Sequence, residues 1–264
     1  MDRIELLEIF DREQRRDVTY YGTRREVTPE VVRHIPDKDG GLGGGAILYS
    51  QLDASNVDRV IAEQRGYFAA LDMEVEWKLY SHDQPADLPE RLLAHGFVPD
   101  EPESVLVLDM DDAPAVYWQS VPPEIRRITE PAGIADVVAM EEAVWQEDKS
   151  WLAEMLTLEL NAPGDIMRLY AAYVDGQAVS AAWIRFHPGT QFASLWGGST
   201  LADFRRRGYY TALLAVRAQE ARSRGFRFLT VDASPMSRPI LQKHGFIHLT
   251  TATAYNWQPT TSDE

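Results

Sequence analysis

The sequence predicts an α/β (α+β) fold built from two similar halves in tandem. A six-residue segment, Leu92–Phe97, is followed 149 residues later by Leu241–Phe246, and both end in His-Gly-Phe. Each copy comes after a run rich in apolar residues, Val75–Tyr80 in the first half and Phe226–Val231 in the second, which predicts a strand. Because the order of elements repeats together with the motif, a duplicated unit is favoured.

The first half contains one clear amphipathic helix, at residues 56–71. Five apolar side chains fall there at helical spacing, so we expect them to face a core: Val57, Val60, Ile61, Phe68 and Leu71. A stretch with three prolines follows this half and is typical of a linker. The predicted organisation is therefore a first domain at residues 1–112, a linker at 113–124 and a second domain at 125–264.

The second half is expected to alternate strands and helices in a definite order. Asp175-Gly176 is a two-residue turn typical of a β-hairpin, and Gly197-Gly198 predicts a bulge because glycine weakens a strand interior. Ser150 is expected to cap the second helix. The predicted elements are a strand at Ile125–Ile128, helices at Ala132–Trp145 and Ser150–Leu160, hairpin strands at Met167–Val174 and Gln177–Phe186, and strands at Gln191–Thr200 and Phe226–Asp232.

The segment between the strand ending at Thr200 and the helix after it predicts an anion site. Three consecutive arginines, Arg205, Arg206 and Arg207, precede Gly208, and helical spacing begins at Thr211. The first turn of a helix presents unpaired N–H groups and the positive end of the helix dipole, which suit a polyphosphate. From residue 200 to 245 nine basic residues face three acidic ones, giving +6 within a chain of −15.

The pattern Arg205-x-x-Gly208-x-Tyr210 resembles the pyrophosphate loop Q/R-x-x-G-x-G/A of the GCN5-related N-acetyltransferases (GNAT), with Tyr210 where Gly or Ala is usual. Ser237–Phe246 resembles the closing helix of that family, and the resemblance covers about the last 140 residues. It implies two acetyltransferase-like domains in tandem, each a mixed, mostly antiparallel sheet flanked by helices. A splayed strand pair is expected in the second copy. The first copy lacks the arginine–glycine loop, so we expect it to be degenerate.

The resemblance implies acetyl-CoA as co-substrate. The residues expected to bind it are Ser199, Thr200, Arg205, Arg206, Arg207, Gly208, Tyr209, Tyr210, Thr211 and Ser234.

The catalytic groups depart from the pattern of that family. The chain has no cysteine, so no acetyl-cysteine intermediate can form and direct attack by an amine is expected. Many family members carry a tyrosine where this chain has Leu241, and a glutamate on the strand before the loop, where this chain has no acid. Candidate replacements are Glu141, Glu142, Glu147 and Asp148 as base, and Ser237 or Tyr255 as acid; a surface or packing role is the alternative for each.

Composition limits the partners. The negative net charge disfavours nucleic acid and anionic membranes, the apolar runs are too short to span a bilayer, and the histidines lack metal-ligand spacing. The absence of cysteine favours a cytoplasmic location. Acidic residues on or just after the predicted helix Ala132–Trp145 favour an amine-bearing small molecule as acceptor. Tryptophans of the second half could hold its cation, and the chain offers five of them: Trp145, Trp151, Trp183, Trp196 and Trp257. Trp257 lies near the end of the sequence. A non-catalytic acyl-CoA sensor or scaffold and a protein or peptide N-acetyltransferase remain alternatives.

Overall fold

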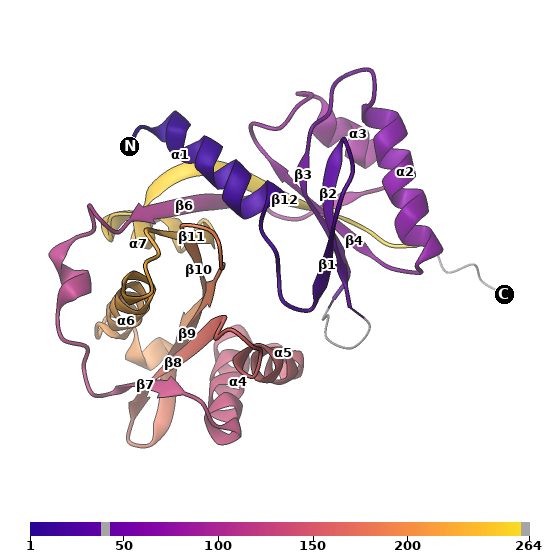
Figure 1. Cartoon of the computed structure of the whole chain (residues 1–264). Coiled ribbons are helices and arrows are strands. Elements are labelled where there is room, and N and C mark those ends of the chain that lie inside the picture. The colour runs from indigo at the N-terminus through magenta and orange to yellow at the C-terminus, as the bar shows by residue number, and fades with distance from the viewer. Residues whose placement is uncertain (38–42, 260–264) are drawn as a thin grey trace. The chain divides into compact units, whose positions relative to one another are not determined.

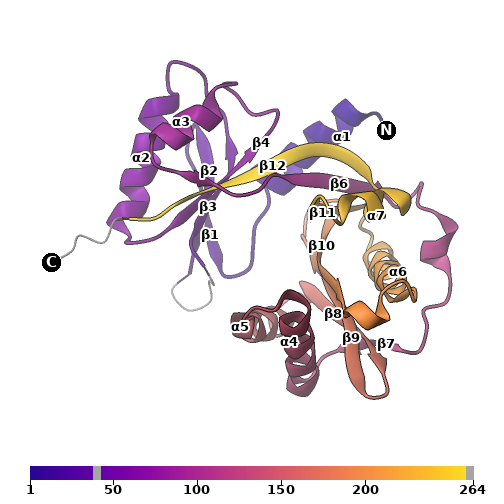
Figure 2. The same ribbon diagram turned by 180° about the vertical axis from the view of Figure 1, so that it is seen from behind.

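The computed structural model of the chain describes residues 1–37 and 43–259 and contains two compact units (Figures 1 and 2). Unit 1 comprises residues 1–106, 232–240 and 248–264, and unit 2 comprises residues 107–231 and 241–247. Because the units are not continuous in sequence, the three-segment division at residues 112 and 124 describes order along the chain and stays a prediction.

Unit 1 contains a sheet with strand order β1-β2-β3-β4-β12. Helices α2 and α3 lie on one side of it, and α1 with the π-helical turn η1 lies on the other (Figures 1 and 2). The pairings are antiparallel except for β3 with β4. Its elements are α1 (Arg3–Phe10), η1 (Asp11–Arg16), β1 (Thr23–Val27), β2 (Val31–Pro36), β3 (Gly45–Ser50), α2 (Val57–Ala70), β4 (Val75–Tyr80), α3 (Leu88–Ala94), β5 (Val98–Pro99) and most of β12 (Ile247–Trp257).

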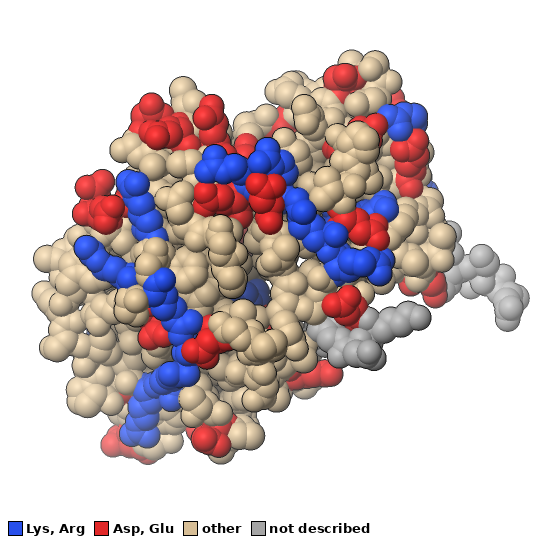
Figure 3. Space-filling view, viewed as in Figure 1, with Lys and Arg blue, Asp and Glu red and all other residues tan. Residues whose placement is uncertain are grey.

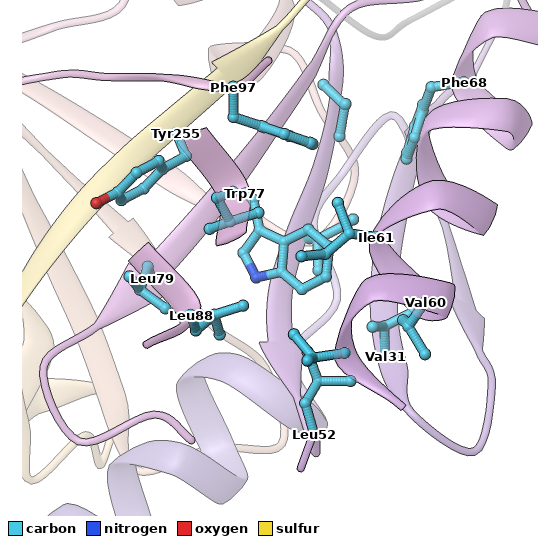
Figure 4. Close-up of a cluster of buried hydrophobic side chains, with 14 of the residues drawn as sticks. Val31, Leu52, Val60, Ile61, Phe68, Trp77, Leu79, Leu88, Phe97 and Tyr255 are labelled. Atoms are coloured by element: carbon cyan, nitrogen blue, oxygen red, sulfur yellow. The ribbon is translucent and has the colours of Figure 1, made fainter. Parts of the chain in front are cut away.

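The predicted amphipathic helix of the first half is confirmed as α2, and its apolar face enters the core of unit 1. Val57, Val60, Ile61 and Phe68 are fully buried there, around Trp77 of β4 (Figure 4). Leu71 was wrongly included in this face, because the helix ends at Ala70 and its side chain is 44% exposed.

Unit 2 contains a sheet with strand order β11-β10-β9-β8-β7, with α4 and α5 on one face and α6 on the other (Figures 1 and 2). Its elements are the 3-10 turn η2 (Ala115–Trp118), β7 (Ile125–Ile128), α4 (Pro131–Trp145), α5 (Ser150–Leu160), β8 (Met167–Val174), β9 (Gln177–Phe186), β10 (Phe192–Thr200), the 3-10 turn η3 (Ala202–Phe204), α6 (Tyr209–Ser223) and most of β11 (Phe228–Ala233). Two further elements, β6 (Glu103–Asp109) and α7 (Arg238–Lys243), contribute residues to both units.

The hairpin of unit 2 forms as the sequence predicts. Strands β8 and β9 pair antiparallel across Asp175 and Gly176, whose φ angles of 50° and 84° give the left-handed turn that matches strand twist. The cap assignment of Ser150 was wrong: Ser150 is the first residue of α5, and its own N–H donates to the Asp148 carboxylate at 2.8 Å.

The predicted bulge in β10 is also confirmed. The register of β10 against β9 shifts between Gly197 and Ser199, and both glycines have positive φ. A Cβ atom on Gly197 would overlap the buried ring of Trp183, so close packing as well as backbone conformation requires glycine there.

Both units share one further feature, a parallel strand pair that separates after three residues. In unit 1, Gly45–Ile47 of β3 pairs with Val75–Trp77 of β4, and in unit 2, Phe192–Ser194 of β10 pairs with Phe228–Thr230 of β11. All four strands continue beyond the last pair. The backbone of each strand past this point is therefore free to bond something other than its parallel neighbour.

Candidate functional site

The segment after β10 is hydrogen-bonded to β9 at its start, and its later backbone N–H groups have no partner among the described residues. The Leu201 N–H donates to the Val179 carbonyl at 2.9 Å, which ties the end of the strand to β9. The Arg205 Nε–H donates to the Thr200 carbonyl at 3.1 Å. Gly208 then precedes α6 with φ +88°, a conformation that favours glycine, and a Cβ there would meet no atom within 4 Å.

Consecutive backbone N–H groups have no partner among the described residues at this turn. Among residues 1–37 and 43–259, none accepts a hydrogen bond from the N–H groups of residues 206 to 211, and the first such donation comes from Ala212 to the Gly208 carbonyl at 2.9 Å. These donors coincide with the positive end of the dipole of a fifteen-residue helix. The turn is therefore chemically suited to an anion with several oxygens.

The basic residues of this region divide into two groups. Arg205, Arg206 and Arg207 are exposed, and none pairs with a carboxylate of the described residues. Other basic residues of this region form ion pairs within unit 2: Arg224 pairs with Glu220 at 2.7 Å, and Arg227 pairs with Asp109 at 2.7 Å. The charge that the sequence places here is thus available to a ligand mainly at the turn itself. Elsewhere basic and acidic side chains lie next to one another on the face drawn in Figure 3.

Tyr210, the departure from the family pattern, is accommodated by turning its ring inward. The ring lies against Gly198, where an added Cβ would be 3.1 Å from it, and 6.4 Å from the His244 ring centroid. Burial raises the pKa of Tyr210. Thr211 lies beside it, with Oγ1 3.3 Å from Nε2 of His244. Because the ring packs on the inner side, the backbone N–H of Tyr210 stays open.

One of the candidate bases, Glu141 of α4, is hydrogen-bonded to Ser199 on the strand that leads to this turn. Glu141 is 4% exposed, and its Oε2 accepts hydrogen bonds from Ser199 Oγ at 2.8 Å and from Trp145 Nε1 at 2.9 Å. Trp145 Nε1 also lies 3.2 Å from Ser199 Oγ. Burial raises the pKa of Glu141, and the hydrogen bonds from Ser199 and Trp145 partly offset this effect.

The remaining candidates are placed differently. Glu142 accepts the Lys149 N–H at 3.2 Å, Glu147 pairs with Lys149 at 2.7 Å, and Asp148 binds the first turn of α5. Ser234 and Ser237 belong to unit 1 and contact each other, with their hydroxyl oxygens 3.2 Å apart.

Tyr255 is part of the hydrophobic core of unit 1 (Figure 4). Of the five tryptophans considered, Trp145, Trp151 and Trp196 are exposed, Trp183 is buried and Trp257 is half-buried.

Sequence reasoning missed Arg217, which is 2% exposed and has no carboxylate partner in the described part of the chain. Its Nη1 donates to the carbonyls of Trp183 at 3.1 Å and Trp196 at 3.3 Å, next to the bulge. Burial lowers the pKa of Arg217 to about 10. Its helical position on α6 gave no signal, because an arginine at that spacing is usually solvated.

No group of three or more His, Cys, Asp or Glu side chains among the described residues could hold a metal ion. No helix within this part of the chain is both long and apolar enough to cross a membrane.

Comparison with known proteins gives a match over part of the second half. Residues 135–246 match the model of the acetyltransferase (GNAT) family. Curated proteins gave no match. Among solved structures, the chain is similar to a GCN5-related N-acetyltransferase from Kribbella flavida, with 17% identity, a TM-score of 0.65, and coverage of 96% of this chain and 93% of that one.

Two further structures have the same fold. A conserved protein of unknown function from Staphylococcus epidermidis shares 12% identity at a TM-score of 0.63, with coverage of 96% of this chain and 99% of that one. A tandem GNAT protein from the clavulanic acid biosynthesis pathway shares 15% identity at a TM-score of 0.60, with coverage of 93% and 86%. Residues 135–246, which contain α4, the bulged strand β10 and the arginine–glycine turn, are therefore the part of the chain that matches the acetyltransferase (GNAT) family.

Proposed function

We propose that the chain transfers an acetyl group from acetyl-CoA to an amine of a small molecule, and that the second half carries this activity. The observation that carries the proposal is the run of unpaired N–H groups from residue 206 to residue 211, at the start of α6 and beside three exposed arginines. A diphosphate accepts several N–H donors at once and benefits from both charge and dipole.

The strand before the turn supports the same ligand. Pairing of β10 with β11 ends at Ser194, and the bulge lies between that residue and Thr200. An extended amide-containing arm such as pantetheine would bond to the free backbone in this part of β10. We propose Ser199 and Thr200 for the thioester end, and Arg205, Gly208 and the first residues of α6 for the diphosphate; Ser234 stays a prediction.

The first copy, by contrast, fills the equivalent positions with its own side chains. At the start of α2 the Asp53 carboxylate accepts the N–H groups of Ser55 at 2.7 Å and Asn56 at 3.2 Å, together with the Ser55 hydroxyl at 2.6 Å. These bonds lower the pKa of Asp53. An acid already occupies the N–H groups that a phosphate would need, and its charge repels an anion.

The separated strands of unit 1 are also occupied. Arg15 of η1 is 1% exposed, and its Nε donates to the carbonyl of Leu48, the residue just after the paired part of β3, at 3.0 Å. Its guanidinium lies 4.0 Å over the ring of Tyr80 at the end of β4 and donates to Asp83 at 2.7 and 2.9 Å. We therefore propose that the first copy is degenerate and that each chain binds one CoA.

Direct attack is the mechanism we propose, because the chain has no cysteine to form an acetyl-cysteine intermediate. The amine nitrogen would bond to the thioester carbonyl carbon while the carbon–sulfur bond breaks and CoA leaves. Holding both reactants in one geometry supplies much of the acceleration. N–H donors near Ser199 and Thr200 would stabilise the oxyanion. The acetyl group, the acceptor and a cytoplasmic location stay predictions.

Calorimetric titration with CoA tests the binding site. The double variant Arg205→Ala/Gly208→Asp removes a guanidinium and places a carboxylate at the open N–H groups, so binding should be abolished. The matched control Arg224→Ala/Gly225→Asp makes the same chemical change at the other end of α6 and should retain wild-type affinity. Unaltered affinity in the first variant would refute the site, and two CoA per wild-type chain would refute the degenerate first copy.

One observation favours a second candidate, a non-catalytic acyl-CoA sensor or scaffold. Leu241 is 1% exposed and apolar where many family members carry a tyrosine as general acid, and β10 contains no carboxylate. An assay of thiol release with acetyl-CoA and a mixed panel of amines separates the two. Thiol release that depends on an added amine indicates an enzyme. CoA binding without any release indicates a sensor, and release only with lysine-containing peptides indicates a protein acetyltransferase.

A further inference from the structure

We infer, building on the proposed function, that Ser199 and Glu141 form the proton relay of the transfer, and that the acceptor is a cation whose ammonium group is held against Trp145 and Trp196. Ser199 would touch the amine, and Glu141 would act through Ser199. The arrangement assigns roles to a buried acid, a bulged strand and two exposed indoles that otherwise have no explanation.

Glu141 is buried, yet its Oε1 has no hydrogen-bond partner among the described residues. Leaving a buried carboxylate oxygen unpaired is costly, and structures keep such groups chiefly where a ligand or a reaction uses them. Its other oxygen is held by Ser199 and Trp145, so the side chain has a fixed orientation.

Ser199 is held in a fixed position by hydrogen bonds. Its carbonyl accepts the Ser180 hydroxyl at 2.7 Å, which fixes the backbone directly after the bulge. Its own hydroxyl donates to Glu141 and accepts from Trp145, and a hydroxyl has a second lone pair. One acceptor position of Ser199 Oγ is therefore left for an incoming N–H, on the strand that we propose holds the thioester.

Trp145 and Trp196 are aromatic side chains on the side of the sheet covered by α4 and α5. Trp196 lies opposite Trp183 in the β10–β9 register, so both project on one side of the sheet, and Trp183 packs in the core beneath α4 and α5. Trp145 lies on α4. Trp196 is 40% exposed, and Trp145, which donates to the buried Glu141, is 50% exposed; both values are large for indoles.

These rings already attract cations. The Arg185 guanidinium lies 4.5 Å from the ring centroid of Trp196, and Lys149 Nζ lies 5.9 Å from that of Trp145. The segment Pro131–Leu160 also carries seven acidic residues against Lys149 alone. An ammonium-bearing acceptor thus meets attractive charge as well as π-faces, whereas an anionic one is repelled.

The relay balances as follows. The acceptor ammonium gives one proton to Ser199 Oγ, and Ser199 gives its own proton to Glu141 Oε2. The nitrogen lone pair then bonds to the acetyl carbonyl carbon, the carbon–sulfur bond breaks, and the CoA sulfur takes the second N–H proton. Glu141 returns its proton to water. One ammonium and one acetyl-CoA give one amide, one CoA thiol and one proton.

The experiment compares Glu141→Gln, Ser199→Ala and the control Glu154→Gln, an exposed acid on α5. The acceptors are spermidine and tyramine, with the zwitterion glycine for contrast. We expect kcat to fall about 100-fold or more in the first two variants, and CoA affinity to stay within about twofold in Glu141→Gln, because a general base contributes ~10²–10⁴ to the rate and not to CoA binding. The control should match wild type, and glycine should be the poorest acceptor.

The pH profile separates a proton relay from a merely structural role. Wild-type kcat should fall as the pH is lowered and Glu141 becomes protonated, and Glu141→Gln should lack this acid limb. Lys149 is the charged neighbour whose positive charge lowers the pKa of Glu141. Trp196→Leu should raise KM for the amine about tenfold with little change in kcat.

Retention of kcat and of the acid limb in Glu141→Gln, or in Ser199→Ala should the first variant not fold, overturns the relay. A wild-type chain that binds CoA but acetylates none of the amines also overturns it, whereas a chain that does not bind CoA refutes the proposed function instead.

Discussion

Replacing Gly197 by alanine tests how the bulge in β10 is maintained. Gly197 has φ +67°, and an alanine held in the left-handed region costs about 1–2 kcal/mol. Its Cβ would lie 2.7 Å from Cε3 of Trp183 and closer still to Cζ3. The Trp183 ring cannot move aside easily because it is packed in the core between the sheet and α4, so overpacking adds roughly 1–3 kcal/mol. The expected loss of stability in unit 2 is therefore about 2–5 kcal/mol.

Gly176→Ala is the matched control for this substitution. Gly176 has φ +84° and lies in the hairpin turn of the same unit, where an added Cβ meets no atom within 4 Å. This variant should lose only the conformational part, about 1–2 kcal/mol. Hydrogen exchange of β9 and β10 at increasing urea measures unit 2 by itself. Equal destabilisation by the two substitutions would refute the claim that contact with Trp183 constrains the bulge.

Three further predictions concern charge. Arg15→Met leaves Asp83, whose side chain is 4% exposed, without its guanidinium partner, and should destabilise unit 1 by about 3–5 kcal/mol in urea unfolding, whereas Arg59→Met, at an exposed ion pair, should leave stability nearly unchanged. CoA affinity should fall severalfold as salt rises from about 0.05 to 0.5 M, and the dependence should be weaker in Arg205→Gln; an unchanged salt dependence would contradict a role for that guanidinium. Burial lowers the pKa of His34 to about 4, so between pH 6.5 and 4 only the unfolded chain gains this proton, and stability should fall by about 3 kcal/mol over that range, with a smaller fall in His34→Gln.

Local patterns were sufficient for many elements of the fold. The bounds of β4, α5, β8 and β9 agree with the sequence prediction, because hydrophobic spacing and turn residues act over a few neighbours. The paired glycines of β10 likewise predicted its bulge, since positive φ is a property of the residue type. The cap of α5 was predicted wrongly, because two neighbouring residues, Asp148 and Ser150, could each have supplied the acceptor.

Pairing between distant segments was not accessible in the same way. The last strand, β12, pairs antiparallel with β4 in unit 1, joining Trp257 to Val75 and Ala252 to Tyr80. Nothing in either strand states its partner, because apolar strands of similar composition can pair in many registers. Arg15 and Arg217 were missed as buried cations for a related reason: burial depends on what packs above a residue and not on its own identity.

The sequence by itself determined the chemical character of this protein: a basic, glycine-containing turn at the start of a helix, no thiol, and an acidic helix pair with several indoles. These follow from residue types and their spacing. Only the tertiary structure distinguished Glu141 from the other acids, since it brings Glu141 to Ser199 across 58 residues and buries both. Hydrogen-bond partners and burial arise from long-range packing, and those two quantities set whether a carboxylate is a surface charge or a candidate base.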